Sequence, residues 1–280
     1  MKIIRAEDIS DQVESLCLKC NFELPQDIFQ SLIETEKKEQ VPRAKKILQC
    51  LIENALIAKK EKIAICQDCG IGVFFVEIGQ DIYIEGDLYH AIQQGMASAY
   101  KNGYLRKSMV KHPFIRENTG DNLPAVIHTE IKEHNCLVIY FAPKGAGSEN
   151  CSKTNFFNPS ATLEEIQNWI IEQTINAAKK ACGPLILGIG IGGSSEYAPL
   201  LAKKALLRNM GERNPDSLIC KMEESITLLA NETGIGPQGL GGDITVLDTF
   251  IDQYPTHIAM LPVSINFQCH AARHGKIIWQ

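Results

Sequence analysis

Cysteine thiols offer this sequence its widest choice of chemistry. The chain carries ten cysteines, at positions 17, 20, 50, 66, 69, 136, 151, 182, 220 and 269. Two C-x-x-C pairs, Cys17 with Cys20 and Cys66 with Cys69, could supply four thiolates to a structural zinc ion. The two pairs lie farther apart than in zinc ribbons or fingers, and the first pair falls in an expected helix, where packing explains it better. A thioredoxin-like redox pair is weaker still, because the required sheet context is missing.

A second candidate is the glycine-rich stretch "GIGIGG" at 188–193. It follows a predicted strand, opens a predicted helix and formally matches the dinucleotide-binding fingerprint. The acidic residue that should end a second strand about twenty residues later is missing, since Glu212 falls in a turn between predicted helices. A glycine turn that brings a helix N-terminus close to an anion explains the stretch equally well.

Three glycine-rich loops, "KGAGSEN", "GIGIGGSSE" and "GPQGLGGD", leave backbone N–H groups exposed. Such groups suit carboxylate or phosphate oxygens. Three cysteines lie at the ends of predicted helices or strands, namely Cys66, Cys182 and Cys269. Metal ligands that are distant in sequence often occupy such positions. Three thiolates on a four-iron cluster would leave one iron without a protein ligand, able to bind a substrate's hydroxyl and carboxylate as a Lewis acid.

Hydrophobic periodicity predicts the elements that must position these residues. Helices are expected over 24–40, 42–62, 87–103, 161–182, 195–209 and 216–234, and strands over 71–79, 81–86, 124–131, 135–143 and 184–190, with glycine-rich loops and short strands after 234. The strands at 124–131 and 135–143 are expected to pair. The fold class is therefore α/β, with mixed sheets flanked by helices. We expect a single catalytic domain over 1–280, with a helical N-terminal subdomain over 1–60.

Composition narrows the classes of function. The chain has 280 residues, of which 45% are hydrophobic, so it can bury a sizeable core. The net charge is −5 and no basic stripe stands out, which disfavours nucleic acid as a partner. No stretch approaches the roughly 18 apolar residues that a membrane span needs, and charged residues interrupt the start of the chain. A cytoplasmic location is expected.

Seven ordered blocks of sequence carry a resemblance to a known family. They are "CQDCG" at 66–70, "GYLRKS" at 103–108, "RENTGDNLPA" at 116–125, "PKGAGSEN" at 143–150, "ACGPLILGIGIGGSSE" at 181–196, "GIGPQGLGGD" at 234–243 and "THIAMLPVSINFQCHAAR" at 256–273. Together they make residues 40–280 resemble the α part of the class I, iron–sulfur fumarases and their relative L-tartrate dehydratase.

The resemblance implies a set of site residues. It makes Cys66, Cys182 and Cys269 the ligands of a 4Fe-4S cluster with one open iron. It implies that Gln67, Asp68, Arg106 and the backbone of Gly147 hold a dicarboxylate substrate, and that His257 lines the site. Cys69 is not a ligand in this interpretation, since the family commonly has another residue there.

The resemblance also implies a partner. Single-chain members continue into a second domain that completes the substrate site, whereas this sequence stops at Gln280. It is therefore expected to be the α subunit of a two-chain enzyme with a separate β subunit, in an α₂β₂-like assembly. Ala146, where single-chain members tend to have glycine, and the spare thiol of Cys151 depart from the pattern.

These residues suggest a hydration reaction, fumarate to L-malate. Asp68 can act as an acid or orient the substrate hydroxyl, with His257 as its partner, and Arg106 can grip a carboxylate bidentately. Without the resemblance, structural interpretations are the more usual ones. An aspartate in the position of Asp68 usually forms a turn or caps a helix, Arg106 would be a solvated residue at a helix end, and His257 would be a hydrogen-bonded core residue. L-tartrate dehydration is the alternative; overall length slightly favours fumarate.

Three basic residues flank the last predicted cluster ligand, namely His270, Arg273 and His274. They are interpreted as a basic helix end in preference to hydrogen-bonding groups that tune the cluster potential.

Overall fold

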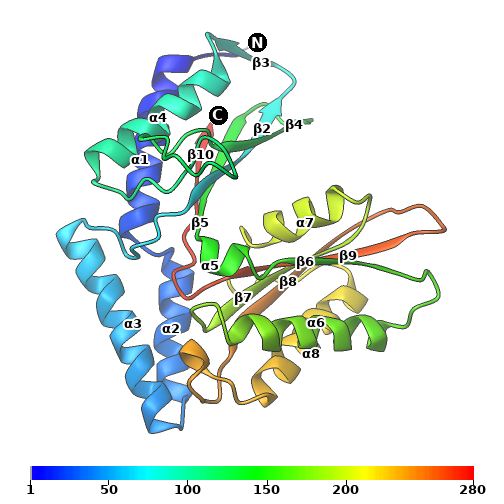
Figure 1. The fold of residues 1–280 in the computed structure, drawn as a ribbon. Coiled ribbons are helices and arrows are strands. Elements are labelled where there is room, and N and C mark those ends of the chain that lie inside the picture. Colours follow the sequence, from blue (N-terminus) through cyan, green and yellow to red (C-terminus); the bar gives the residue numbers. More distant parts are fainter. Residues whose placement is uncertain (1) are drawn as a thin grey trace. The chain divides into compact units, whose positions relative to one another are not determined.

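The structure, a computed structural model, describes residues 2–280 and groups the chain into two compact units (Figure 1). Unit 1 consists of the residues up to Pro25, Asn54–Ala146 and Arg273–Gln280, and unit 2 of Gln26–Glu53 and Gly147–Ala272. Helices and mixed sheets occur in both units, which confirms the α/β class. The single domain with a helical N-terminal subdomain stays a prediction.

In unit 1, helices α1 and α4 lie side by side against a four-stranded sheet of order β10-β5-β2-β4 (Figure 1). Its elements are β1 (Lys2–Arg5), α1 (Ala6–Phe22), the C-terminal part of α3 (Pro42–Glu61), β2 (Ile71–Gly79), β3 (Ile82–Glu85), α4 (Leu88–Asn102), β4 (Val126–Lys132), β5 (Leu137–Lys144) and β10 (Gly275–Trp279). Helix α4 begins as predicted after Asp87, whose carboxylate accepts a hydrogen bond from the His90 N–H at 2.9 Å. Strand β1, which pairs with β3, was not predicted.

The predicted pairing of β4 with β5 is wrong. Strand β2 lies between them, parallel to β4 and antiparallel to β5. The core of β2, "VFFV", is fully buried, so the backbone N–H and C=O groups on both of its edges need strand partners instead of water. Strand β4, "VIHTEIK", carries exposed residues along its length and forms the edge of the sheet.

In unit 2, a four-stranded sheet of order β6-β9-β7-β8 has α7 on one face and α6 and α8 on the other (Figure 1). Its elements are α2 (Gln26–Lys38), the N-terminal part of α3, α5 (Ala146–Glu149), β6 (Lys153–Phe157), α6 (Leu163–Ala178), β7 (Leu185–Gly192), α7 (Tyr197–Ala205), α8 (Ser217–Glu232), η1 (Pro237–Gly239), β8 (Val246–Tyr254) and β9 (Leu261–Gln268). Helix α6 starts with a capping box between Thr162 and Glu165.

Most glycines of "GIGIGG" lie inside the strand itself, and only Gly192 and Gly193, both with positive φ, form the turn that leads to α7. Gly188 and Gly190 belong to β7. A Cβ atom would lie 2.1 Å from the Ala202 carbonyl oxygen at Gly188, and 2.1 Å from the Ala198 carbonyl oxygen at Gly190. These glycines therefore let the backbone of α7 approach the sheet, and this steric need accounts for them without a nucleotide.

We predict that Gly190→Ala destabilises the protein by about 1–3 kcal/mol, because the added methyl group overlaps the backbone of α7. Urea denaturation followed by circular dichroism measures the loss. Gly147→Ala is the matched control, since a Cβ there meets no atom within 4 Å and should leave the unfolding midpoint unchanged. Equal midpoints for the two variants would contradict this explanation of Gly190.

A buried carboxylate of α8, that of Glu223, pairs with Arg208 and binds the backbone of strand β8 within unit 2. Glu223 is fully buried, and its Oε1 atom accepts hydrogen bonds from the Arg208 guanidinium and the Ile251 N–H, both at 2.8 Å. Its Oε2 atom accepts from the Asn214 N–H at 3.1 Å. Every acceptor of this carboxylate therefore faces a donor, which is the condition for burying a charge.

Candidate functional site

The loop between α3 and β2 holds three predicted site residues, Cys66, Gln67 and Asp68. Gln67 is exposed, and Cys66 and Asp68 are half-buried. The carboxylate of Asp68 accepts hydrogen bonds from two backbone groups, the Gly70 N–H at 3.0 Å and the Ala146 N–H at 2.7 Å. Asp68 thus forms the turn that its sequence context suggests, and its remaining oxygen lone pairs leave capacity for a further donor.

Cys69 is a buried structural thiol. Its Sγ atom accepts a hydrogen bond from the Arg106 N–H at 3.2 Å, and the thiol lies 3.7 Å from the Cys66 carbonyl oxygen, to which it donates. Burial raises the pKa of Cys69, which keeps the thiol protonated at neutral pH. Cys69 therefore connects the loop of Cys66 to the segment of Arg106.

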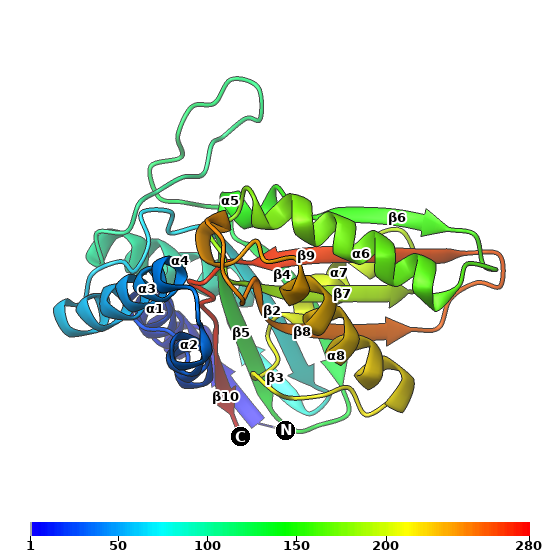
Figure 2. The same ribbon diagram turned by 90° about the horizontal axis from the view of Figure 1, so that it is seen from below.

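Arg106 lies at the base of the segment that connects α4 to β4, which projects from unit 1 (Figure 2). Its side chain is exposed. Hydrogen bonds within the segment hold its two ends together: the amide oxygen of Asn122 accepts from the N–H groups of Ser108 and Met109, at 2.6 and 3.1 Å. Arg106 is therefore available to an anion, and its backbone is fixed by Cys69.

Gly147 lies in the short helix α5 of unit 2. Its surroundings are open and its φ angle is ordinary, so neither sterics nor backbone conformation within this chain explains a glycine here. The neighbouring Glu149 binds Lys203, and its Oε2 atom accepts from the Asn266 amide at 3.0 Å, which ties α5 to β9. Close approach by a ligand would account for a residue without a side chain.

Cys182 and Cys269 come from adjoining loops of unit 2. Cys182 lies between α6 and β7, and Cys269 directly follows β9. The His270 N–H donates to the Cys182 carbonyl oxygen at 3.0 Å, so the two loops run against each other. Cys182 is exposed and Cys269 half-buried. Cys66 belongs to unit 1, and the assignment of all three cysteines as cluster ligands stays a prediction.

His257 occupies the turn between β8 and β9 and is exposed, unlike the core histidine that its sequence context suggests. Its Nδ1 atom accepts from the Ala259 N–H at 3.1 Å. Strand β9 has 8 residues and separates His257 from Cys269 by about 26 Å at its ordinary rise. The structure therefore does not bring His257 together with the cysteines of unit 2.

The zinc alternative finds no support in the donor geometry. Across residues 2–280, no group of three or more His, Cys, Asp or Glu side chains gathers in a way that could hold a metal ion. Cys17 and Cys20 lie in the core of unit 1 beside α4. Burial raises the pKa of Cys17, and it raises the pKa of Cys20 to about 12. Both thiols are therefore protonated packing residues in this fold.

We predict that iodoacetamide at pH 8 leaves Cys17 and Cys20 of the native protein unmodified, because the reactive species is the thiolate. Mass spectrometry of tryptic peptides measures the modification. Cys50, which is exposed, is the internal control and should react. Both core cysteines should react once the protein is unfolded in urea; their rapid reaction in the native state would contradict this description of the core.

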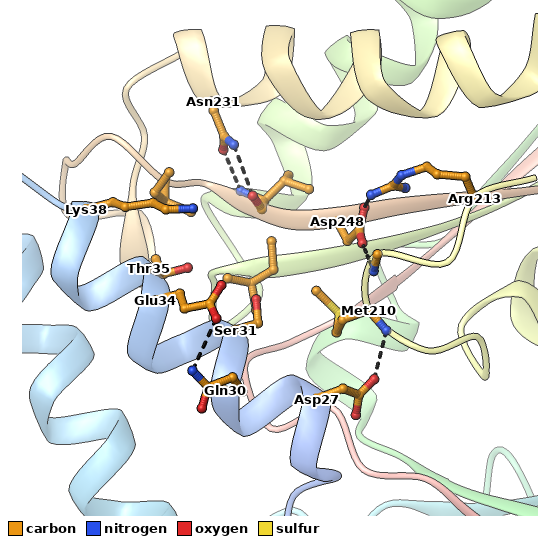
Figure 3. A pocket seen from close by; sticks show the side chains of 14 residues that line it. Asp27, Gln30, Ser31, Glu34, Thr35, Lys38, Met210, Arg213, Asn231 and Asp248 are labelled. Carbon is orange, nitrogen blue, oxygen red and sulfur yellow. Dashed lines mark hydrogen bonds and ion pairs between the residues drawn. The ribbon is translucent and has the colours of Figure 1, made fainter.

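A pocket of about 560 Å³ opens in unit 2 between α2 and the start of β8 (Figure 3). Its polar groups pair largely with one another: Arg213 donates to Asp248 at 2.6 Å, and Asp27 accepts from the Met210 N–H at 2.8 Å. None of the predicted site residues lines it. This pocket is therefore separate from the predicted site residues.

The sequence did not predict that a buried side chain, that of Arg273, would bind the backbone of the Cys66 loop. Arg273 is 2% exposed and donates to the Asp68 carbonyl oxygen at 2.8 Å, so its interpretation as part of a basic helix end is wrong. No helix occurs there; the chain passes from β9 through a loop to β10. The available signal was the apolar setting of Arg273, close to "AA" and "GKIIW".

Comparison with known proteins identifies the class of enzyme. The sequence profile of the family described as "Fumarate hydratase (Fumerase)" matches residues 10–278. The chain is therefore a hydro-lyase, an enzyme that adds water to a double bond or removes it. More particularly, it belongs to the fumarate hydratase family, which confirms the resemblance carried by the seven sequence blocks.

Individual relatives carry tartrate dehydratase names. A protein of Methanocaldococcus jannaschii, provisionally named L(+)-tartrate dehydratase subunit alpha, is 41% identical over 276 residues, covering 95% of this chain and 96% of its own length. The L(+)-tartrate dehydratase subunit alpha of Escherichia coli K12 is 28% identical over 258 residues, covering 91% of this chain and 85% of its own length.

No helix within 2–280 is long and apolar enough to cross a membrane.

Proposed function

We propose that this chain is the α subunit of a two-chain 4Fe-4S hydro-lyase that interconverts fumarate and L-malate. The observation that carries the proposal is the match to the fumarate hydratase family over 10–278. Two structural features support it: the cysteines of adjoining loops in unit 2, and a surface loop that presents Cys66, Gln67 and Asp68 together. We further propose a cytoplasmic location.

Cysteine thiolates are the usual protein ligands of an iron–sulfur cluster. Cys66, Cys182 and Cys269 would be its ligands: Cys182 is exposed and the other two are half-buried, unlike Cys17, Cys20 and Cys69, which are buried in the core. When bound, the cluster supplies an iron without a protein thiolate, a Lewis acid for the substrate's hydroxyl and carboxylate.

The remaining residues would act on the substrate directly. The exposed guanidinium of Arg106 can donate two parallel hydrogen bonds to a carboxylate, and the amide of Gln67 and the N–H of Gly147 can add further donors. The carboxylate of Asp68 is held by two backbone N–H groups. It can accept a hydrogen bond from the substrate hydroxyl or, when protonated, deliver a proton to the substrate. His257 would have to take part from its separate position at the turn before β9.

L-tartrate dehydration to oxaloacetate is the second candidate. The names of the M. jannaschii and E. coli relatives favour it. Malate and tartrate differ by one hydroxyl group, so a single added hydrogen-bonding group can change the preference. Those same names speak of a subunit alpha, which supports the proposal of a separate β subunit for this chain.

The test is the activity of the anaerobically purified complex of this chain with its β subunit. We expect malate to form fumarate, measured by ultraviolet absorbance, with a higher kcat/KM than tartrate. A preference for tartrate would replace the substrate assignment and leave the reaction class intact. A complex with a complete cluster and no activity on either diacid would overturn the proposal.

A further inference from the structure

Three consecutive carbonyl groups of the Cys66 loop each accept a hydrogen bond from a buried side chain of unit 1. Arg273 donates to the Asp68 oxygen at 2.8 Å, Tyr100 to the Cys69 oxygen at 2.6 Å, and Asn122 to the Gly70 oxygen at 3.1 Å. We call these three side chains the carbonyl clamp. They come from three separate segments of the chain, so the loop is held from several directions at once.

The clamp is built from groups that are costly to bury. Arg273 is 2% exposed, and apart from Asp68 its one hydrogen-bond partner is the Asn21 amide oxygen at 3.1 Å. It forms no ion pair within residues 2–280, and its Nε atom has no hydrogen-bond partner there. A buried guanidinium without a carboxylate opposes folding, so packing alone would favour an apolar side chain at this position.

Tyr100 adds a hydroxyl group that stays a donor. It is fully buried, and burial raises its pKa, so the phenol remains protonated throughout the neutral range. Its oxygen also lies 3.1 Å from the Gly70 carbonyl oxygen. The hydroxyl therefore contacts the carbonyl groups of the two residues that directly follow Asp68, namely Cys69 and Gly70.

The same loop carries three of the proposed site residues, Cys66, Gln67 and Asp68. The clamp fixes the carbonyls from inside, while the Gly70 and Ala146 N–H groups fix the Asp68 carboxylate. Cys66 and Gln67 precede these fixed groups; Cys66 is half-buried and Gln67 is exposed. Such supporting hydrogen bonds set the orientation of ligands and reacting groups.

We propose that Arg273 and Tyr100 are positioning residues for the reaction: through the carbonyls of Asp68 and Cys69 they hold Cys66 and Asp68 in the orientation that catalysis needs. The proposal rests on the proposed function of this loop. It predicts that the two residues affect turnover by an intact cluster as well as stability.

The test compares Tyr100→Phe and Arg273→Lys with Thr174→Val in the anaerobic complex with the β subunit. Thr174 is a matched control, because its buried hydroxyl also donates to a backbone carbonyl, that of Ile170 at 2.8 Å, within α6 of unit 2. We expect kcat per intact cluster to fall about 10–100-fold in both clamp variants and to stay unchanged in Thr174→Val. Arg273→Lys should keep more activity than Arg273→Met, because it retains one donor.

A second measurement does not depend on activity. Hydrogen–deuterium exchange of the amides at 66–70 should accelerate in the clamp variants and stay unchanged in Thr174→Val. Clamp variants with normal kcat per cluster beside an active wild type would overturn the positioning role, whatever their stability. An inactive wild-type complex with a complete cluster would instead refute the proposed function.

Discussion

Replacing Cys182 with serine is expected to abolish the binding of one 4Fe-4S cluster per chain and to lower hydro-lyase activity by at least about 10³-fold. A Lewis-acidic metal contributes several kcal/mol to such a reaction, and each 1.36 kcal/mol is tenfold in rate. The variant should fold normally, since Cys182 is exposed in a loop. Iron and sulfide analysis after anaerobic reconstitution measures the cluster, and malate dehydration measures the activity.

Cys220→Ser is the control for this prediction. Cys220 is half-buried in α8 of the same unit and lies outside the predicted ligand set, so its replacement should leave iron content and activity unchanged. If Cys182→Ser retained a full complement of iron and sulfide, the assignment of Cys182 as a ligand would be wrong. Loss of the cluster in both variants would point to a general effect of altering unit 2.

Replacing Glu223 with alanine is expected to destabilise the protein by about 3–5 kcal/mol, the usual consequence of removing one partner of a buried ion pair. The substitution removes the 2.8 Å carboxylate partner of Arg208, whose guanidinium keeps a more distant carboxylate, that of Asp252 at 3.5 Å, and it leaves the N–H groups of Ile251 and Asn214 without their acceptor. Glu223→Gln retains one amide oxygen and should lose less. Equilibrium urea denaturation measures the free energy of unfolding.

Glu224→Ala is the matched control, because the neighbouring side chain is exposed on the same helix. Its free energy of unfolding should stay within about 0.5 kcal/mol of the wild type. Equal stabilities of the two alanine variants would contradict the buried network as a source of stability. This prediction is independent of the enzymatic function.

Local elements were predictable because their signals lie within a few residues of one another. Strand β2 occupies 71–79 as predicted, and α3 begins at Pro42, where proline suits the first turn. Helices α4 and α8 follow the capping residues Asp87 and Asp216. The sequence blocks likewise sufficed to identify the family, because they span most of the chain.

The arrangement of those elements could not be predicted in the same way. The position of β2 between β4 and β5 depends on which strands need two neighbours, a property of the assembled sheet. The glycines of β7 fit a nucleotide-binding fingerprint by sequence, yet the backbone of α7 is what they accommodate. In both cases partners distant in sequence decided between interpretations that local patterns left open.

The amino-acid sequence by itself determined the longer helices, most strands, the family and the list of residues able to do chemistry. The tertiary structure alone decided what holds those residues: the clamp of Tyr100, Asn122 and Arg273 on the Cys66 loop, and the contact between the loops of Cys182 and Cys269. The physical reason is that helix periodicity and capping act between near neighbours. Every residue has a backbone carbonyl, so the type of the accepting residue does not indicate that a side chain donates to it. The donor can therefore be identified only in the folded chain.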